Sequence, residues 1–225
     1  MEAVLTRPNR AVVEHLVRRA VYTRLGKPLP QTAIAPNSVV VNVSVRHCHL
    51  THEAVEALFG KGHQLTAHKS LYQEGQFAAK ETVTLIGPRS HVISNLRIVG
   101  PCRDFNQVEL ACSDAVALGF NIPLRLSGNI TGTPGAMLMG PNGFFEMKHG
   151  VIRAMRHVHM SPTDAEFYGI RDGEVLKLKI GGECGIVLDK MLCRVDQKFK
   201  LEANIDTDEG NACNLQPHTP VGLIR

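Results

Sequence analysis

One short segment occurs twice in this chain and constrains its fold more than any other feature. The two copies read RHCHLTHEAVEALFG at 46–60 and RHVHMSPTDAEFYG at 156–169. Each copy follows an apolar run, places Thr51 or Ser161 where it can cap a short helix, and ends near a glycine. A repeat of this size predicts two related β units with pseudo-twofold symmetry.

The residues before the first copy indicate a β-strand. Valines occupy alternate positions in VVVNVSV at 39–45, which is typical of a half-buried strand. Because side chains at i and i+2 of a strand share a face, His47 and His49 continue the valine face. His157 and His159 repeat this arrangement in the second copy.

Two imidazoles on one face of a strand can bind one divalent metal ion. A single pair is more often structural, but matching pairs in both copies of a repeat favour metal binding. Zinc takes three or four protein ligands, and Glu109 in QVELACSD is placed to supply a carboxylate. The corresponding segment of the second half, LEANIDTDEGN, offers Asn204. Strand parity turns Cys48 away from such a site.

The composition favours a β fold with an aliphatic core. Hydrophobic residues make up 44 % of the 225 residues, aromatic residues only 5 %, and there is no tryptophan. The 20 glycines and 12 prolines suit turn-rich barrels or sandwiches better than a helical bundle.

The net charge of +4 belongs to the N-terminal segment. Residues 1–36 hold six basic and two acidic side chains, so the rest of the chain carries 19 of each sign. A neutral body with few aromatic residues argues against nucleic-acid binding. No apolar run approaches the roughly 18 residues of a membrane helix. The six cysteines form no CxxC pair and predict reduced thiols.

The N-terminal segment predicts an amphipathic helix on a linker. Apolar residues recur at helical spacing in 9–25, with Asn9 as a candidate N-cap and Gly26 as a stop. A proline-rich stretch follows, so we expect the helix within 1–28 and the linker at 29–36. Such a helix could dock on its own body, bind a partner surface, or serve as an organelle transit peptide.

Several longer motifs, in order over 38–215, resemble the PduL-type phosphate propanoyltransferase (phosphotransacylase) family of bacterial microcompartments. The matching pieces are SVRHCHL, LYQEGQFAAKETVTLIGP, LRIVGPCRDFNQVEL, SGNITGTPG, VIRAMRHVHMSPTDAEFYGI, GGECGIVLD and NIDTDEGNA. The resemblance implies a mainly β fold of two interlocked, pseudo-symmetric small β-barrels with short capping helices. It assigns 37–46 and 155–225 to one barrel and 47–154 to the other.

The resemblance also implies two zinc ions at the junction of the barrels. The first is assigned to His47, His49 and Glu109. The second is assigned to His157, His159 and position 204, where this chain has Asn204 and the family has a histidine.

The implied reaction converts a short-chain acyl-CoA, propanoyl-CoA by the family name, and phosphate into acyl phosphate and CoA. Such a transfer needs a Lewis acid for the developing oxyanion and a fixed cation for phosphate. Arg103 matches the family's phosphate-binding arginine and is the predicted catalytic residue. The family contacts CoA at positions corresponding to Ser44, Val45, Arg46, Arg97 and Asn211, and Ser90 after the GPR turn is a further candidate.

The family resemblance gives the N-terminal helix a role. Members carry such a helix to enter the lumen of a bacterial microcompartment, so 9–25 is predicted to contact shell proteins or core enzymes. An exposed apolar helix also favours self-association, which makes a homo-oligomer a further hypothesis.

Two other functions stand as alternatives. An HxH motif at the end of a strand also occurs at the start of metal-dependent hydrolases of the amidohydrolase type. Those barrels need eight βα units, whereas this body has few long helices. A non-catalytic metal-binding paralogue or scaffold would close its zinc coordination with protein ligands. Only two or three ligands per site are evident here, which favours an enzyme.

Overall fold

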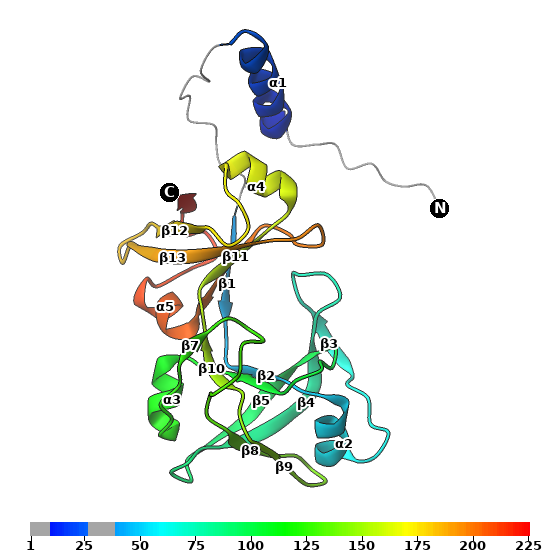
Figure 1. Cartoon of the computed structure of the whole chain (residues 1–225). Helices are drawn as coiled ribbons and strands as arrows, with labels where there is room; N and C mark the ends of the chain where they lie inside the picture. Colours follow the sequence, from blue (N-terminus) through cyan, green and yellow to red (C-terminus); the bar gives the residue numbers. More distant parts are fainter. Residues whose placement is uncertain (1–9, 27–38) are drawn as a thin grey trace.

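The computed structural model describes residues 10–26 and 39–225. It shows two curled β-sheets joined end to end, with short helices at their edges (Figure 1). The predicted mainly β fold is therefore confirmed. Asn9 and the linker at 29–36 lie outside the described residues.

The six-stranded sheet forms the upper half in Figure 1 and has the strand order β1-β14-β11-β13-β12-β15. Its core is aliphatic and includes Val158, Leu178, Ile180 and Met191. Its strands are β1 (Val40–Ser44), β11 (His157–Met160), β12 (Val175–Ile180), β13 (Ile186–Val195), β14 (Glu202–Asp206) and β15 (Val221–Ile224).

The nine-stranded sheet forms the other half and has the order β7-β10-β6-β2-β5-β4-β8-β9, with β3 paired to β4. Cys48, Leu85, Ile98 and Leu138 are fully buried in its core. Its strands are β2 (His47–His49), β3 (Ala67–Ser70), β4 (Phe77–Ile86), β5 (Val92–Gly100), β6 (Gln107–Glu109), β7 (Leu124–Arg125), β8 (Ala136–Met139), β9 (Phe144–Met147) and β10 (Val151–Ala154).

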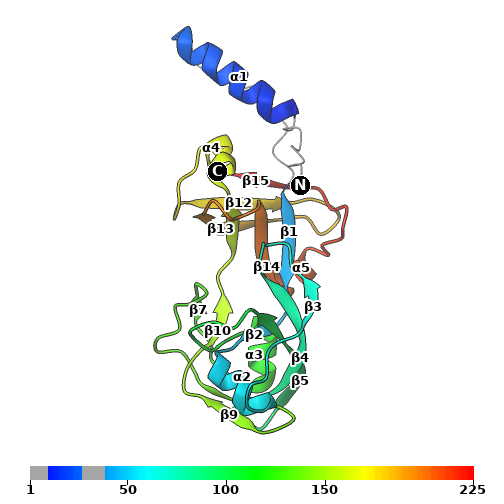
Figure 2. The ribbon, with the colours of Figure 1, turned by 90° about the vertical axis from the view of Figure 1, so that its right-hand side faces the viewer.

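The chain crosses between the two sheets directly before each histidine pair. It leaves the six-stranded sheet at β1 and enters the other at β2, and it returns between β10 and β11. Figure 2 shows these connections running along the long axis of the molecule. The crossings place both histidine pairs at the junction of the halves, while the exact barrel boundaries stay a prediction.

The helices follow from local capping signals. In α2 (His52–Phe59) the Thr51 side chain accepts from a backbone N–H, and in α4 (Pro162–Tyr168) Ser161 forms a capping box with Asp164. Both caps were predicted from the repeat. The remaining helices of the body are α3 (Cys112–Leu118) and α5 (Thr207–Ala212).

A buried ionic cluster joins the two halves. Arg153 on β10 donates to Asp206 at 2.7 Å and to Glu209 at 3.2 Å, and Arg156 donates to Glu209 at 2.6 Å. Asp206 and Glu209 are each only 8 % exposed. Their negative charge is thus compensated by Arg153 of β10 and by Arg156 in the connection to the second histidine pair.

The Arg153→Met variant is expected to lose about 3 kcal/mol of unfolding free energy, because it leaves buried carboxylates without one of their cations. Urea unfolding followed by circular dichroism measures this loss. The control is Lys177→Met, which removes an exposed cation from β12. Equal losses of unfolding free energy in both variants would contradict a stabilising role of the ionic cluster between the halves.

The N-terminal helix α1 (Arg10–Arg24) stands apart from the body in Figure 1. An exposed ion pair between Arg19 and Glu166 of α4 links it to the six-stranded half. Its apolar residues Val13, Leu16 and Val17 are exposed. None of the described helices has the length and apolar character needed to cross a membrane.

Candidate functional site

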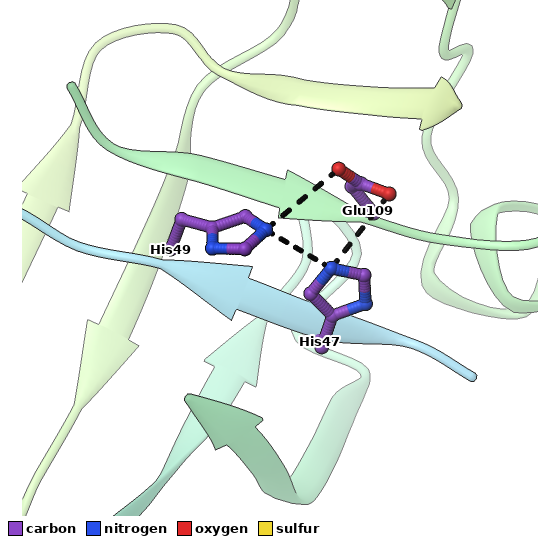
Figure 3. Close-up of side chains that lie close together, drawn as sticks. All are labelled: His47, His49 and Glu109. Atoms are coloured by element: carbon purple, nitrogen blue, oxygen red, sulfur yellow. Dashed lines mark hydrogen bonds and ion pairs between the residues drawn. The ribbon is translucent and has the colours of Figure 1, made fainter. Parts of the chain in front are cut away.

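The first histidine pair lies in the middle of the nine-stranded sheet. Strand β2 pairs with β5 on one side and β6 on the other, and this register sets His47 opposite Glu109 and His49 opposite Gln107. Figure 3 shows both imidazoles and the Glu109 carboxylate pointing toward one another. We call His47, His49 and Glu109 the first station.

Backbone carbonyls fix the tautomers of both histidines. His47 Nδ1 lies 2.8 Å from Val45 O, and His49 Nδ1 lies 3.0 Å from Val99 O. A carbonyl oxygen only accepts, so in each neutral ring Nδ1 carries the proton and Nε2 a lone pair. The two Nε2 atoms are 3.2 Å apart. Two lone pairs that close repel each other, and a cation between them removes the repulsion.

The separations of the donor atoms fit a zinc ion. Glu109 carboxylate oxygens lie 3.7 Å from His47 Nε2 and 3.9 Å from His49 Nε2. Ligands around a tetrahedral zinc, at bonds of about 2.0 Å, are about 3.3 Å from one another. Three protein donors leave one position for substrate or water. The first station therefore fits a zinc site of the catalytic rather than the structural kind.

The environment keeps His49 ready to bind a metal. Burial lowers the pKa of His49 to about 2, with His47 and Arg103 adding to the effect and the hydrogen bond to Val99 opposing it. The imidazole is therefore neutral at physiological pH, and the neutral form is the one that ligates.

The metal-free protein is expected to lose stability as the pH falls below about 6.5, because the unfolded chain then binds a proton that folded His49 excludes. With a folded pKa of about 2 for His49, this residue alone contributes a loss of about 1.4 kcal/mol per pH unit. Unfolding free energies between about pH 7 and pH 5 measure the slope. His49→Gln should reduce the slope by that amount and leave the contribution of His157, whose pKa is lowered to about 4, whereas His68→Gln, at an exposed position on β3, should not change it. Equal slopes in the two variants would contradict a buried neutral His49.

A hydrogen-bond network connects Glu109 to Arg103. Gln107 is fully buried, and its Nε2 donates to Glu109 Oε1 at 2.7 Å and to Ser127 Oγ at 2.8 Å. Its Oε1 accepts from the Gly128 N–H at 2.7 Å, so the whole amide is satisfied. Arg103 Nη1 donates to the same Ser127 hydroxyl at 3.2 Å. Loop 127–128 thus holds the carboxylate and the guanidinium in one framework.

Arg103 combines burial with a permanent charge. Burial lowers the pKa of Arg103, Glu109 opposes this, and Arg194 adds to it. A guanidinium keeps its proton even so. Its planar group lies 5.7 Å above the ring of Phe105. This cation beside the first station can bind an anionic substrate such as phosphate.

The second histidine pair repeats the register of the first. On β11, His157 lies opposite Asn204 and His159 opposite Glu202. We call His157, His159 and Asn204 the second station. Burial lowers the pKa of His157 to about 4, so its ring is neutral as well.

The amide of Asn204 contacts neighbouring side chains and is not directed at a metal position. Its Oδ1 accepts from Asn42 Nδ2 at 2.9 Å, and its Nδ2 lies 3.5 Å from Glu202 Oε2. Within the described part of the chain, only the first station brings three donor atoms within 4.8 Å of one another. The second station does not fit a zinc site in this arrangement, and a second ion stays a prediction.

A pocket between the two stations brings their residues together. Its lining includes Ser44, Glu109, Met155, His157, Asn204 and Asp206. Glu109 of the first station and His157 of the second therefore face one cavity. Their roles in binding or catalysis stay predictions.

The predicted CoA contacts are spread around the junction. Ser44 lines the pocket, and Val45 next to it is 61 % exposed. Arg46 forms an ion pair with Asp114 of α3 at 2.7 Å. The remaining three lie on other elements: Arg97 on β5, where it donates to the carbonyls of Ala79 and Lys80, Asn211 on α5, and Ser90 in the turn before β5.

The structure shows two residues at the stations that were not predicted from the sequence. Gln107 and Glu202 each lie two positions before Glu109 and Asn204, so strand parity places them on the same faces and could have revealed them. Cys48 is fully buried and its pKa is raised by burial, which agrees with the prediction that it points away and excludes it as a ready nucleophile.

Comparisons with known proteins identify the relatives of this arrangement. A family model described as phosphate propanoyltransferase matches residues 40–216. A curated protein named phosphate propanoyltransferase from Planctopirus limnophila is 49 % identical over 96 % of this chain and 92 % of its own. Relatives of the same name are 48 % identical in Thermotoga maritima, over 83 % and 89 % of the two chains, and 45 % identical in Priestia megaterium, over 91 % of each.

Proposed function

Because the chain belongs to the phosphate propanoyltransferase family, a family of phosphotransacylases, we propose that it interconverts propanoyl-CoA and phosphate with propanoyl phosphate and CoA, and that it does so with zinc. The observation that carries the zinc proposal is the first station: three donors at zinc spacing, tied through Gln107 and Ser127 to Arg103. His157 of the second station lines the same pocket from the other half.

The first station fits zinc, so His47 Nε2, His49 Nε2 and a Glu109 oxygen would hold the ion. Bound there, it would supply a Lewis acid that polarises the thioester carbonyl. The fixed tautomers of both histidines and the hydrogen bond from Gln107 to Glu109 keep the ligand atoms in place before the ion arrives.

Arg103 would bind and orient phosphate. Its guanidinium offers paired donors that match two phosphate oxygens, and Ser127 accepts from Nη1 to hold its direction. One phosphate oxygen then bonds to the acyl carbon as the carbon–sulfur bond breaks. The proton released by phosphate passes to the thiolate of CoA, which balances the reaction without an acyl-enzyme.

The CoA moiety would run along the junction from the pocket. Ser44 lies in the pocket wall, and the exposed Val45 and Arg46 follow it directly. Arg46 forms an ion pair with Asp114, and its side chain remains 46 % exposed, so its charge is accessible to a phosphate of CoA. Arg97, Asn211 and Ser90 are the other proposed contacts.

The discriminating experiment follows thiol release from propanoyl-CoA with and without phosphate. A phosphotransacylase releases CoA only when phosphate is present and forms propanoyl phosphate in equal amount. A metal-dependent hydrolase would release CoA in both cases, and a non-catalytic paralogue in neither. Either of those results would overturn the proposed function.

We also propose that the enzyme works in the lumen of a bacterial microcompartment and that α1 carries it there. The support is the exposed apolar stripe of α1, formed by Val13, Leu16 and Val17. Amphipathic helices of this kind bind apolar grooves of partner proteins.

A fluorescent protein carrying residues 1–36 is expected to concentrate in shells assembled in a bacterial host. The stripe drives the interaction, so Leu16→Glu with Val17→Glu should leave the fusion diffuse. Arg24→Glu, at an exposed polar position of the same helix, serves as the control. Diffuse fluorescence from the unaltered fusion would contradict the targeting role.

A further inference from the structure

The carboxylate and the amide opposite the histidines have swapped positions between the two stations. At the first station the carboxylate of Glu109 pairs with the leading histidine and the amide of Gln107 with the following one. At the second station the amide of Asn204 takes the leading place and the carboxylate of Glu202 the following one. The carboxylate of the second station therefore lies beside His159, where the first station has an amide.

His159 differs from the other three histidines at its Nδ1 atom. Backbone carbonyls accept from Nδ1 of His47, His49 and His157. His159 Nδ1 is buried and has no hydrogen-bond partner among the described residues, and Glu202 Oε2 lies 3.8 Å away. His159 is only 9 % exposed, and its ring packs on Phe199, with centroids 4.2 Å apart. A buried unpaired ring nitrogen is costly, and the adjacent carboxylate is the acceptor suited to it.

Gln73, from the other half of the molecule, fixes this carboxylate. The loop between β3 and β4 extends toward the six-stranded half (Figure 1). Gln73 in this loop is 7 % exposed, and its Nε2 donates to Glu202 Oε2 at 2.8 Å and to Lys200 O at 3.1 Å. Its Oε1 accepts from Lys200 N at 3.1 Å. All three hydrogen bonds of this amide are therefore made to Glu202, the first residue of β14, or to Lys200, two positions before it.

We propose that Gln73 is a positioning residue for the site: it fixes the Glu202 carboxylate beside His159, so that Nδ1 of His159 carries the proton and Nε2 is left with its lone pair. Nε2 thereby takes the same state as in the other three histidines, although no backbone carbonyl serves His159. The ring of His159 lies 4.7 Å from that of His157, which lines the pocket. The catalytic consequence rests on the proposed function, whereas the protonation of the ring does not.

Long-range 1H–15N spectra of the protein as purified test the proposal, because ring-nitrogen shifts distinguish the two tautomers. The signals of His159 are assigned by their loss in His159→Gln. We expect the Nδ1–H form in the wild type. An Nε2–H form there would overturn the proposal before any variant at position 73 is made.

Gln73→Glu is the sharpest variant, because it keeps the acceptor for Lys200 N but replaces the donor to Glu202 by a second negative charge. We expect it to displace Glu202, shift His159 toward the Nε2–H form, and lower kcat about tenfold, which corresponds to about 1.4 kcal/mol in the activation barrier, with KM for propanoyl-CoA within about twofold. Glu74→Gln, at the exposed neighbouring position, should change neither. The double variant with Glu202→Gln should be no worse than Glu202→Gln alone.

An unchanged tautomer in Gln73→Glu would overturn the proposal, as would a shifted tautomer with unchanged kcat. A lower melting temperature as the sole effect would show that Gln73 only joins the halves. If the wild type shows no transacylase activity, the tautomer data still decide the role of Gln73, so failure of the proposed function and failure of this inference are separate results.

Discussion

The Glu109→Gln variant is expected to lose zinc and to lower kcat/KM by more than about 100-fold. Loss of a partner outside the ligand shell already costs about 10- to 100-fold, and Glu109 is the charged member of the ligand set itself. The amide keeps the shape and the hydrogen-bonding partner Gln107 but removes the negative charge that balances the cation. Zinc content by mass spectrometry of the metal and steady-state kinetics measure the two effects.

Glu146→Gln is the matched control, because Glu146 is exposed on β9, which is separated from β2 and β6 by other strands of the sheet. It should retain zinc and activity. If Glu109→Gln kept full zinc content and wild-type kcat/KM, the first station would not be the metal site. Activity lost with zinc retained would instead assign Glu109 a role other than metal binding.

The Arg103→Ala variant is expected to lower kcat/KM for phosphate about 100- to 1000-fold, the usual effect of removing one preorganised group that stabilises charge in the transition state. The fall should appear in phosphate kinetics, while KM for propanoyl-CoA changes little, because Arg103 is proposed to contact phosphate alone. Zinc content should stay unchanged. Arg103→Lys should recover only part of the loss, since an ammonium lacks the paired donors of the guanidinium.

The control for Arg103 is Arg171→Ala, which removes an exposed arginine from the six-stranded half. It should leave phosphate kinetics unaltered. A larger change in KM for propanoyl-CoA than for phosphate in Arg103→Ala would contradict the proposed role and move Arg103 to the CoA site.

Local patterns in the sequence predicted much of the first station. Strand parity placed His47 and His49 on one face and turned Cys48 into the core, where it is fully buried. The repeat predicted the Thr51 and Ser161 caps and the match between the two histidine pairs. Glu109 could be predicted because it ends a short strand. Antiparallel pairing of β2 with β6 brings it opposite His47.

Other parts of the site depend on contacts between distant segments, which local patterns do not encode. Gln73 reaches Glu202 across 129 positions of the chain, and Asn42 reaches Asn204 across 162. The exchange of β1 into the sheet of the C-terminal strands was expected from the family resemblance and not from the residues of β1. Whether the second station can hold a metal ion likewise depends on how neighbouring side chains contact Asn204. The residue type at position 204 alone did not determine it.

Propanoyl-CoA formation from propanoyl phosphate and CoA, with zinc content determined on the same sample, tests the proposed zinc-dependent transacylase most directly. We expect activity with about one tightly bound zinc ion per chain, because three donors converge only at the first station among the described residues. Removal of that zinc by a chelator should abolish activity, and added zinc should restore it. Full activity in metal-free protein, or bound zinc with no acyl transfer, would contradict a zinc-dependent transacylase.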